Sequence, residues 1–217
     1  MKAMILAAGR GERMGALTDN CPKPLLRVGD YCLIEHHLIR LAEAGVQDVV
    51  INLWYLGDQI QEYLGQSIYG LRLYYSVEKQ LLGTGGGVQK ALPLLGDEPF
   101  LLLSADVWTD YPLEQLPKKL SGLAHLVLVD NPPFHPNGDY SLNQSYLSHD
   151  FQHRLNYAGF GILDPQLFND CPNVPFEIGA LFSKAVEMKQ VTGEHYQGAW
   201  FNVGTPDILK TLDEYLV

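Results

Sequence analysis

The sequence of 217 residues has little cysteine, an excess of acids over cations, and no long apolar run. Its three cysteines, Cys21, Cys32 and Cys171, have no CxxC spacing, which favours free thiols in a reducing compartment over a disulfide framework or a zinc site. No stretch approaches the ~20 apolar residues of a membrane span, and the N-terminus lacks the longer apolar segment of a signal peptide. We therefore expect a cytoplasmic protein that does not enter a membrane.

Positive charge is scarce, since 15 Lys and Arg face 25 Asp and Glu and the formal net charge is −10. A general binder of nucleic acid polymers or anionic membranes would need a broad basic face, so this balance argues against both. The exception is the beginning of the chain, where five Lys and Arg lie within the first 27 positions beside two acids. Such a local cationic loop on an anionic body predicts a small phosphorylated ligand.

Short apolar runs alternate with amphipathic stretches along the whole chain. This alternation predicts one domain, residues 1–217, of the α/β class, with a Rossmann-like, mixed and mostly parallel sheet flanked by helices. In such sheets, ligands lie over the carboxyl ends of the strands, so the loops that follow the strands should converge on one face. The strands are expected at 3–8, 48–53, 71–76, 100–106, 125–130, 157–163 and 200–203, and the helices at 34–45, 57–64, 86–95, 180–189 and 207–216.

The loop after the first expected strand matches neither common phosphate-binding motif. A dinucleotide loop of the form GxGxxG would need glycine where Met14 stands, and the GK[ST] of a Walker loop is absent. Nevertheless, Gly9 and Gly11 let backbone N–H groups turn toward phosphate oxygens, and prolines on both sides hold Lys23 on a stiff segment. The alternative is a solvent-exposed basic loop that connects a strand to a helix.

The same loop carries a long signature. The chain reads LAAGRGERM at 6–14 and PKPL at 22–25, and it continues with LLGTGGG, SADVWTD, GDY, NYAGFGI and WFNVGT. On these motifs, which extend over essentially the whole sequence, it resembles the sugar-phosphate nucleotidyltransferases, also called nucleotide-sugar pyrophosphorylases. The resemblance implies an enzyme that uses Mg²⁺ to transfer a nucleotidyl group from a nucleoside triphosphate to a sugar 1-phosphate, releasing pyrophosphate.

The resemblance also implies that two parts of the chain bind different substrates. The nucleotide-binding part is expected at about 1–110 and the sugar-binding part at about 111–217, in a monomer or small homo-oligomer. Within the family, DVWTDY, GLAHLVLVDNP and GEHYQG are most similar to short bacterial uridylyltransferases that act on N-acetylmuramate 1-phosphate in cell-wall recycling. Two alternatives stay open, namely a mannose-1-phosphate guanylyltransferase that makes GDP-mannose and a non-catalytic nucleotide-sugar binding protein.

The catalytic residues implied by the family are Arg13, Lys23 and Asp106. Arg13 would bind the departing phosphates, and Lys23 the α-phosphate or the sugar phosphate. Asp106 ends an apolar run, where an unpaired carboxylate is costly, so Mg²⁺ is its expected partner, and a helix N-cap is the alternative. The second metal ligand would be Asn202, where relatives often have aspartate. With one negative charge fewer, we expect weaker Mg²⁺ binding in the absence of nucleotide.

The remaining predicted residues belong to the two substrates. Gln80 offers both a donor and an acceptor, as the edge of uracil requires, whereas the nearby Glu78 would suit guanine. The glycines beside Thr84 would let the flat base approach the backbone closely, and the alternative for this stretch is a simple helix start. Gly15 and Ser104 also depart from the family pattern and leave the identity of the sugar open. The predicted nucleotide-binding residues are Leu6, Ala8, Gly9, Gly11, Gln80 and Gly85, and the predicted sugar-binding residues are Asp139, Asn156, Gly159 and Glu177.

Overall fold

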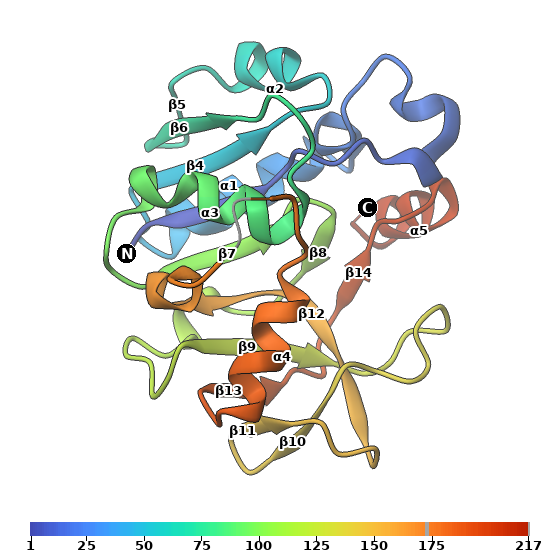
Figure 1. The fold of residues 1–217 in the computed structure, drawn as a ribbon. Coiled ribbons are helices and arrows are strands. Elements are labelled where there is room, and N and C mark those ends of the chain that lie inside the picture. The colour runs from blue at the N-terminus through green and yellow to red at the C-terminus, as the bar shows by residue number, and fades with distance from the viewer. Residues whose placement is uncertain (172–173, 217) are drawn as a thin grey trace.

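A ten-stranded sheet forms the centre of the computed structural model, which describes residues 1–171 and 174–216 (Figure 1). All seven predicted strands are present, six of them in this sheet, and the predicted fold class is confirmed. The strands in spatial order are β10 (Tyr140–Asn143), β11 (Tyr146–Ser148), β13 (Val191–His195), β9 (Ala124–Val129), β12 (Arg154–Leu163), β7 (Phe100–Ser104), β1 (Ala3–Leu6), β4 (Asp48–Leu53), β6 (Leu71–Val77) and β5 (Ser67–Ile68).

The sheet is mixed, with four neighbouring parallel strands between β12 and β5. Strands β7, β1, β4 and β6 run parallel, whereas β12 lies antiparallel between β7 and β9. The carboxyl ends of β1, β4, β6, β7 and β9 therefore share one edge with the amino end of β12, and we call this edge the rim. Ligands of α/β sheets bind at such an edge. The antiparallel β12 thus brings its first residues, including Asn156, to the rim.

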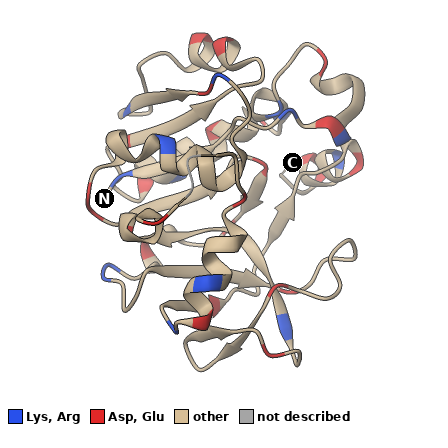
Figure 2. Ribbon diagram, viewed as in Figure 1, with Lys and Arg blue, Asp and Glu red and all other residues tan. Residues whose placement is uncertain are grey.

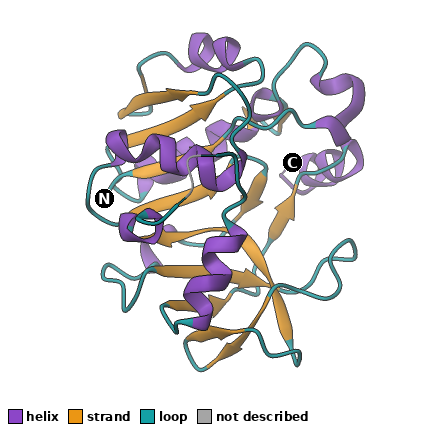
Figure 3. Cartoon of the chain, in the orientation of Figure 1, coloured by secondary structure: helices purple, strands orange, loops and turns teal. Residues whose placement is uncertain are grey.

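Helices cover both faces of the sheet, and all five predicted helices are present (Figures 1 and 3). The helices are α1 (Leu33–Glu43), α2 (Gly57–Leu64), α3 (Gly83–Leu95), α4 (Gly179–Glu187) and α5 (Pro206–Leu216). Residues of α1 and α2 join one buried apolar cluster, and residues of α3 and α4 join a second. On α1 the side chains of Ile34, Leu38 and Leu41 are fully buried, and each contributes about 1.5–3 kcal/mol to folding.

Two short ribbons and four 3₁₀ turns complete the described residues. The seventh predicted strand lies outside the main sheet, as β14 (Trp200–Asn202) paired antiparallel with β8 (Val107–Thr109), and α5 packs beside this ribbon. The second ribbon joins β2 (Arg27–Val28) to β3 (Tyr31–Cys32). The 3₁₀ turns are η1 (Glu12–Thr18), η2 (Lys23–Leu25), η3 (Leu113–Gln115) and η4 (Pro165–Phe168). The Pro-rich stretch 130–139 is a loop.

The charged residues are spread over the fold. Figure 2 shows Lys and Arg as isolated segments, without a continuous basic face in that view. Among the helices of the described residues, none has both the length and the apolar character that crossing a bilayer requires.

The buried His37 on α1 gives the fold a dependence on pH. Its side chain is nearly inaccessible, its Nε2 atom has no hydrogen-bond partner, and burial lowers its pKa to about 4. Below about pH 6.5 the unfolded chain binds a proton that the folded chain does not, so acidification favours unfolding. We expect the free energy of unfolding to fall by up to about 1.4 kcal/mol per pH unit between pH 6 and pH 4.5 from this group alone.

Urea unfolding of the protein in EDTA across this pH range measures that slope. The matched variant is His37→Leu, which has no titrating group at the position and is expected to show a shallower slope. Equal slopes for both proteins would contradict the assignment of this pH dependence to His37.

Candidate active site

An ion pair at the rim joins two of the predicted catalytic residues. The Nζ atom of Lys23 lies 2.7 Å from Oδ2 of Asp106, and the two side chains are 9% and 36% exposed. Lys23 begins η2 in the loop after β1, whereas Asp106 follows β7, the strand next to β1. The two side chains therefore meet across 83 residues of sequence because their strands are neighbours in the sheet.

The stem of Lys23 is held by the glycine loop itself. Gly11 has a left-handed backbone with φ of 69°, a conformation that side chains disfavour. A Cβ atom at Gly11 would lie 3.1 Å from Cβ of Lys23 and 3.3 Å from its Cδ. Pro22 and Pro24 are buried on both sides of the lysine. The glycine thus serves the placement of the ammonium group as well as the backbone turn.

The β8–β14 ribbon places Asn202 beside Asp106. The backbone N–H of Val203 donates to the carbonyl oxygen of Asp106 at 2.8 Å, and Asn202 is in register with Val107. The Oδ1 atom of Asn202 is buried and has no hydrogen-bond partner, although a buried acceptor is normally satisfied. Amide and carboxylate oxygens are the hard donors that Mg²⁺ prefers, so the chemistry of these two neighbouring residues fits the ion.

Protein ligands to such an ion are few. In the part of the chain that the structure describes, no group of three or more His, Cys, Asp or Glu could hold a metal. Mg²⁺ in nucleotide enzymes is often held by one or two carboxylates together with substrate phosphates. This arrangement suits a site that is completed by its nucleotide.

Arg13 lies near the same group, at the end of β14. Its guanidinium is 3.2 Å from the position that a Cβ atom on Gly204 would occupy. The side chain of Arg13 is exposed and forms no ion pair among the described residues. The structure therefore brings Arg13, Lys23, Asp106 and Asn202 to one region of the rim.

The predicted nucleotide-binding residues lie on two loops with different surroundings. Leu6 ends β1 and Ala8 is buried, whereas a side chain on Gly9 would meet nothing within 4 Å, so this glycine faces open space. Gln80 is exposed on the loop between β6 and α3. The space beside Gly85, in contrast, is filled by protein.

Gly85 allows a close approach to Phe176. A Cβ atom at position 85 would lie 2.2 Å from the Phe176 ring, and the Gly85 N–H donates to the Phe176 carbonyl at 3.0 Å. Glu177 also lies at this end of α3, where its Oε2 accepts a hydrogen bond from the Thr84 hydroxyl at 2.7 Å. The glycines at the start of α3 thus approach a protein segment, whereas the sequence suggested the approach of a flat base.

The predicted sugar-binding residues form two groups. Asp139, Asn156 and Gly159 lie around the first half of β12, whereas Glu177 is at the start of α4. Gly159 has φ of 87°, and a Cβ atom there would lie 2.9 Å from Val107. The sequence predicts all four from the family pattern, but the structure places only three of them around β12, whereas Glu177 contacts Thr84 at the start of α3.

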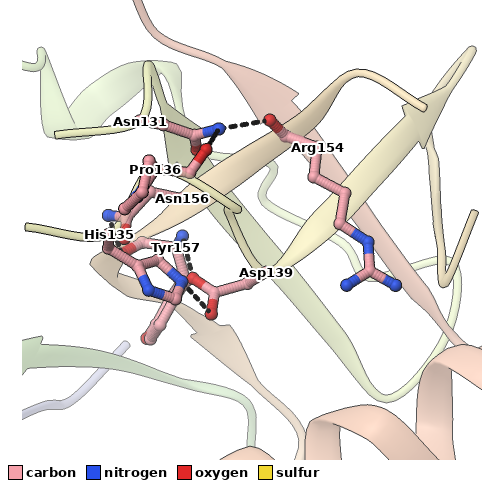
Figure 4. A network of polar contacts seen from close by, with 7 residues as sticks. All are labelled: Asn131, His135, Pro136, Asp139, Arg154, Asn156 and Tyr157. Carbon is pink, nitrogen blue, oxygen red and sulfur yellow. Dashed lines mark hydrogen bonds and ion pairs between the residues drawn. The ribbon is translucent and has the colours of Figure 1, made fainter. Parts of the chain in front are cut away.

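A polar network holds the loop that carries Asp139 (Figure 4). The Asp139 carboxylate accepts from the Tyr157 backbone N–H at 2.7 Å and lies 3.0 Å from His135 Nε2. The amide of Asn131 donates to the backbone carbonyl of Arg154 at 2.8 Å. Figure 4 also shows the Arg154 guanidinium pointing away from Asp139.

Arg154 is occupied elsewhere. Its Nε atom donates to the Asp150 carbonyl and its Nη2 atom to the His149 carbonyl, each at 2.8 Å. These two hydrogen bonds hold the β11–β12 connection in place.

Sequence reasoning missed two features of this region. A cavity of about 310 Å³ lies against the β8–β14 ribbon and is lined by Asn202 and by aromatic residues that include Phe134, Tyr196 and Trp200.

The second feature is a buried pair, Asn52 and Glu78, which lie at the ends of β4 and β6. Burial raises the pKa of the Glu78 carboxyl group. The lone asparagine in the apolar run DVVINL is the sequence signal that could have indicated this pair.

Comparison with known proteins gives concordant results. The family model described as "Nucleotidyl transferase" matches residues 2–141. An N-acetylmuramate alpha-1-phosphate uridylyltransferase from Neisseria meningitidis is 44% identical over 97% of this chain and 96% of that protein. A mannose-1-phosphate guanyltransferase from Candida albicans is 33% identical over 95% of this chain but only 62% of its own length. The crystal structure of HddC from Yersinia pseudotuberculosis, 18% identical, has a TM-score of 0.84 over 100% of this chain and 99% of its own, which shows a shared fold.

Proposed function

Because the chain belongs to the nucleotidyl transferase family, we propose that it transfers UMP from UTP to N-acetylmuramate 1-phosphate. The products are a UDP-sugar and pyrophosphate. The observation that carries this proposal is the contact of the Lys23 ammonium with the Asp106 carboxylate at the rim. Asn202, whose buried amide oxygen has no hydrogen-bond partner, lies on the ribbon strand next to Asp106.

The reaction needs placement and charge neutralisation more than proton transfer. The attacking oxygen of a sugar 1-phosphate is already anionic, so no general base is required. In this proposal Lys23 holds the α-phosphate or the sugar phosphate in line, and Arg13 binds the departing pyrophosphate. Both cations reduce the repulsion between two anions that must approach each other.

The divalent ion would be held by Asp106 and Asn202. When bound, Mg²⁺ supplies positive charge that neutralises phosphate oxygens. Asp106 contributes a carboxylate and Asn202 a neutral amide oxygen, so the protein part of the site carries a single negative charge. The Lys23 ammonium contacts Oδ2, one of the two oxygens of that carboxylate.

Two observations favour UTP over GTP. The relative that is 44% identical over nearly the whole chain is named as a uridylyltransferase, whereas the guanyltransferase is more distant. In addition, the Glu78 carboxylate is 4% exposed and accepts hydrogen bonds from Asn52 and Leu82. It is therefore not available to the N–H donors of guanine, and the exposed Gln80 is left to meet the base.

This proposal assigns the reaction to the cytoplasm. UTP is made and used there, and a UDP-sugar that contains muramate serves the recycling of cell-wall sugars. The proposed partners are the two small substrates.

A matrix of four nucleoside triphosphates against four sugar 1-phosphates tests the proposal. The sugars are N-acetylmuramate, N-acetylglucosamine, glucose and mannose 1-phosphates, and released pyrophosphate is measured. We expect the highest kcat/KM for UTP with N-acetylmuramate 1-phosphate. Preference for GTP with mannose 1-phosphate would instead identify a guanylyltransferase, and nucleotide binding without turnover would identify a non-catalytic sensor.

Asn202→Asp is expected to tighten Mg²⁺ binding in the absence of nucleotide. The substitution adds a second negative charge beside Asp106, so the dissociation constant for the ion should fall at least about threefold. Calorimetric titration of the nucleotide-free protein with Mg²⁺ measures it. The control Asn169→Asp adds the same charge to an exposed position. If both variants bind Mg²⁺ as the unmodified protein does, Asn202 is not a ligand.

A further inference from the structure

The end of β4 contains a buried asparagine that connects two neighbouring strands. Asn52 is 3% exposed and lies between Leu6 of β1 and Ser76 of β6 in the sheet register. Its Oδ1 atom accepts from the Ala7 backbone N–H at 2.8 Å, and its Nδ2 atom donates to Oε1 of Glu78 at 2.8 Å. One side chain thus contacts both loops on which the predicted nucleotide-binding residues lie.

Glu78 continues this connection toward α3. Its second oxygen, Oε2, accepts from the Leu82 backbone N–H at 3.0 Å, immediately before the helix begins at Gly83. The carboxylate is buried and forms no ion pair among the described residues. A buried carboxylate that has only neutral partners is costly. A neutral side chain would be less costly here if filling the space were the only requirement.

Helix α3 packs directly against the Asn52–Glu78 pair. A Cβ atom on Gly87 would lie 2.7 Å from Nδ2 of Asn52 and 2.9 Å from Oε1 of Glu78. The glycine therefore lets the helix rest directly on the two side chains. Because no free space remains between the helix and the two side chains, a change in their size or spacing must move the loop or the helix.

We propose that Asn52 and Glu78 form a brace that sets the distance between the loop after β1 and the loop before α3. Glu78 is then a positioning residue for the nucleotide, which it does not touch. This inference rests on the proposed function, since those two loops are the ones assigned to UTP.

The brace depends on the order of its donors and acceptors. The backbone N–H groups of Ala7 and Leu82 are donors at the two ends, so each end of the side-chain pair must offer an acceptor. The Asn52 amide and the Glu78 carboxylate meet this condition, because the amide still has an N–H group that donates to the carboxylate. Glu78→Gln preserves size and shape but replaces one acceptor oxygen by an NH₂ group. Whichever way the two amides are turned, two donors then face each other at one of the contacts.

The same reasoning predicts a rescue. In the double variant Asn52→Asp/Glu78→Gln, the new carboxylate accepts from Ala7 and from the introduced amide, whose oxygen accepts from Leu82. The direction of the central hydrogen bond is reversed, while the end contacts and the total charge are unchanged. The brace is then complete again.

Steady-state kinetics of the full chain with UTP and N-acetylmuramate 1-phosphate test the brace. For Glu78→Gln we expect the KM for UTP to rise at least about fivefold, while kcat and the KM for the sugar phosphate change less than about twofold. The double variant should return within about twofold of the unmodified protein. Glu98→Gln, which removes an exposed carboxylate before β7, is the control for loss of charge.

Other outcomes overturn the brace. A lower melting temperature in Glu78→Gln with an unchanged KM for UTP would show a merely structural role. A double variant that is no better than Glu78→Gln would show that the order of donors and acceptors does not matter. Should Glu78→Gln fail to fold, the KM for UTP of the double variant decides. A value within about twofold of the unmodified protein supports the brace, and a folded double variant with a raised KM overturns it. UTP affinity, measured by calorimetry without sugar phosphate, separates this test from the proposed function. An inactive unmodified protein that still binds UTP would refute the transfer reaction and leave the brace testable.

Discussion

Replacing Lys23 by methionine is expected to lower kcat at least about tenfold, which corresponds to about 1.4 kcal/mol of activation free energy. The reason lies in the environment of the ammonium group. It is nearly buried at the rim, and its stem is held by Gly11 and by prolines on both sides. A charge that is held in place before the reaction stabilises phosphate anions more than a mobile surface charge does. Methionine keeps the length of the stem and removes the charge.

The fold should tolerate this change. The Asp106 carboxylate that loses its partner is 36% exposed, so water can solvate it, and the melting temperature is expected to change little. Lys119→Met, at an exposed position that precedes β9, is the matched control. Measured kcat values of Lys23→Met and Lys119→Met that are equal would show that Lys23 has no part in the reaction.

The meeting of Lys23 and Asp106 was predictable from the sequence because it depends on topology. Parallel strands deliver their following loops to one edge, and both residues follow apolar runs that have the composition of buried strands. Asn202 reaches this region differently, because its strand β14 lies outside the main sheet and pairs antiparallel with β8, the strand that follows Asp106. The chemical roles of these residues stay predictions, since geometry alone shows only that they lie together.

The direction of a strand was harder to predict from the sequence than its position. The run at 157–163 reads as a buried strand, but its apolar character is the same for a parallel and an antiparallel neighbour. The structure shows β12 antiparallel to β7 and β9, with a register shift between Tyr157 and Gly161. The polar strands β10 and β11 form a short hairpin that lacks a strong alternating pattern, and β13 contains a glycine and two charged or titratable residues.

Side-chain partners were the least accessible feature. Gly85 suggested the approach of a base, but a glycine reports only that something lies close, and here that neighbour is Phe176. Glu78 suggested a contact with guanine, yet its carboxylate turns inward to Asn52. The partner that a side chain takes depends on which donors and acceptors still lack a hydrogen bond once the backbone is folded. Sequence spacing does not determine this.

Asp106→Asn is expected to have the largest effect, a fall in kcat of at least about 100-fold, or about 2.7 kcal/mol. The amide is nearly isosteric, so the change removes charge with little change in shape. With the neutral Asn202 beside it, the protein part of the metal site would carry no negative charge. Pyrophosphate release at increasing Mg²⁺ measures the effect, and partial recovery at high Mg²⁺ is expected. Asp97→Asn, which is exposed and precedes β7, is the control.

A double-mutant cycle decides whether Asp106 and Lys23 act together. Their ion pair and their common position at the rim imply that both act on the same phosphates, so each substitution should remove part of what the other contributes. The variant Lys23→Met/Asp106→Asn is therefore expected to lose less activity than the product of the two single losses. Additive losses would mean that the two residues serve separate steps, and the shared phosphate site inferred from their contact would then be wrong.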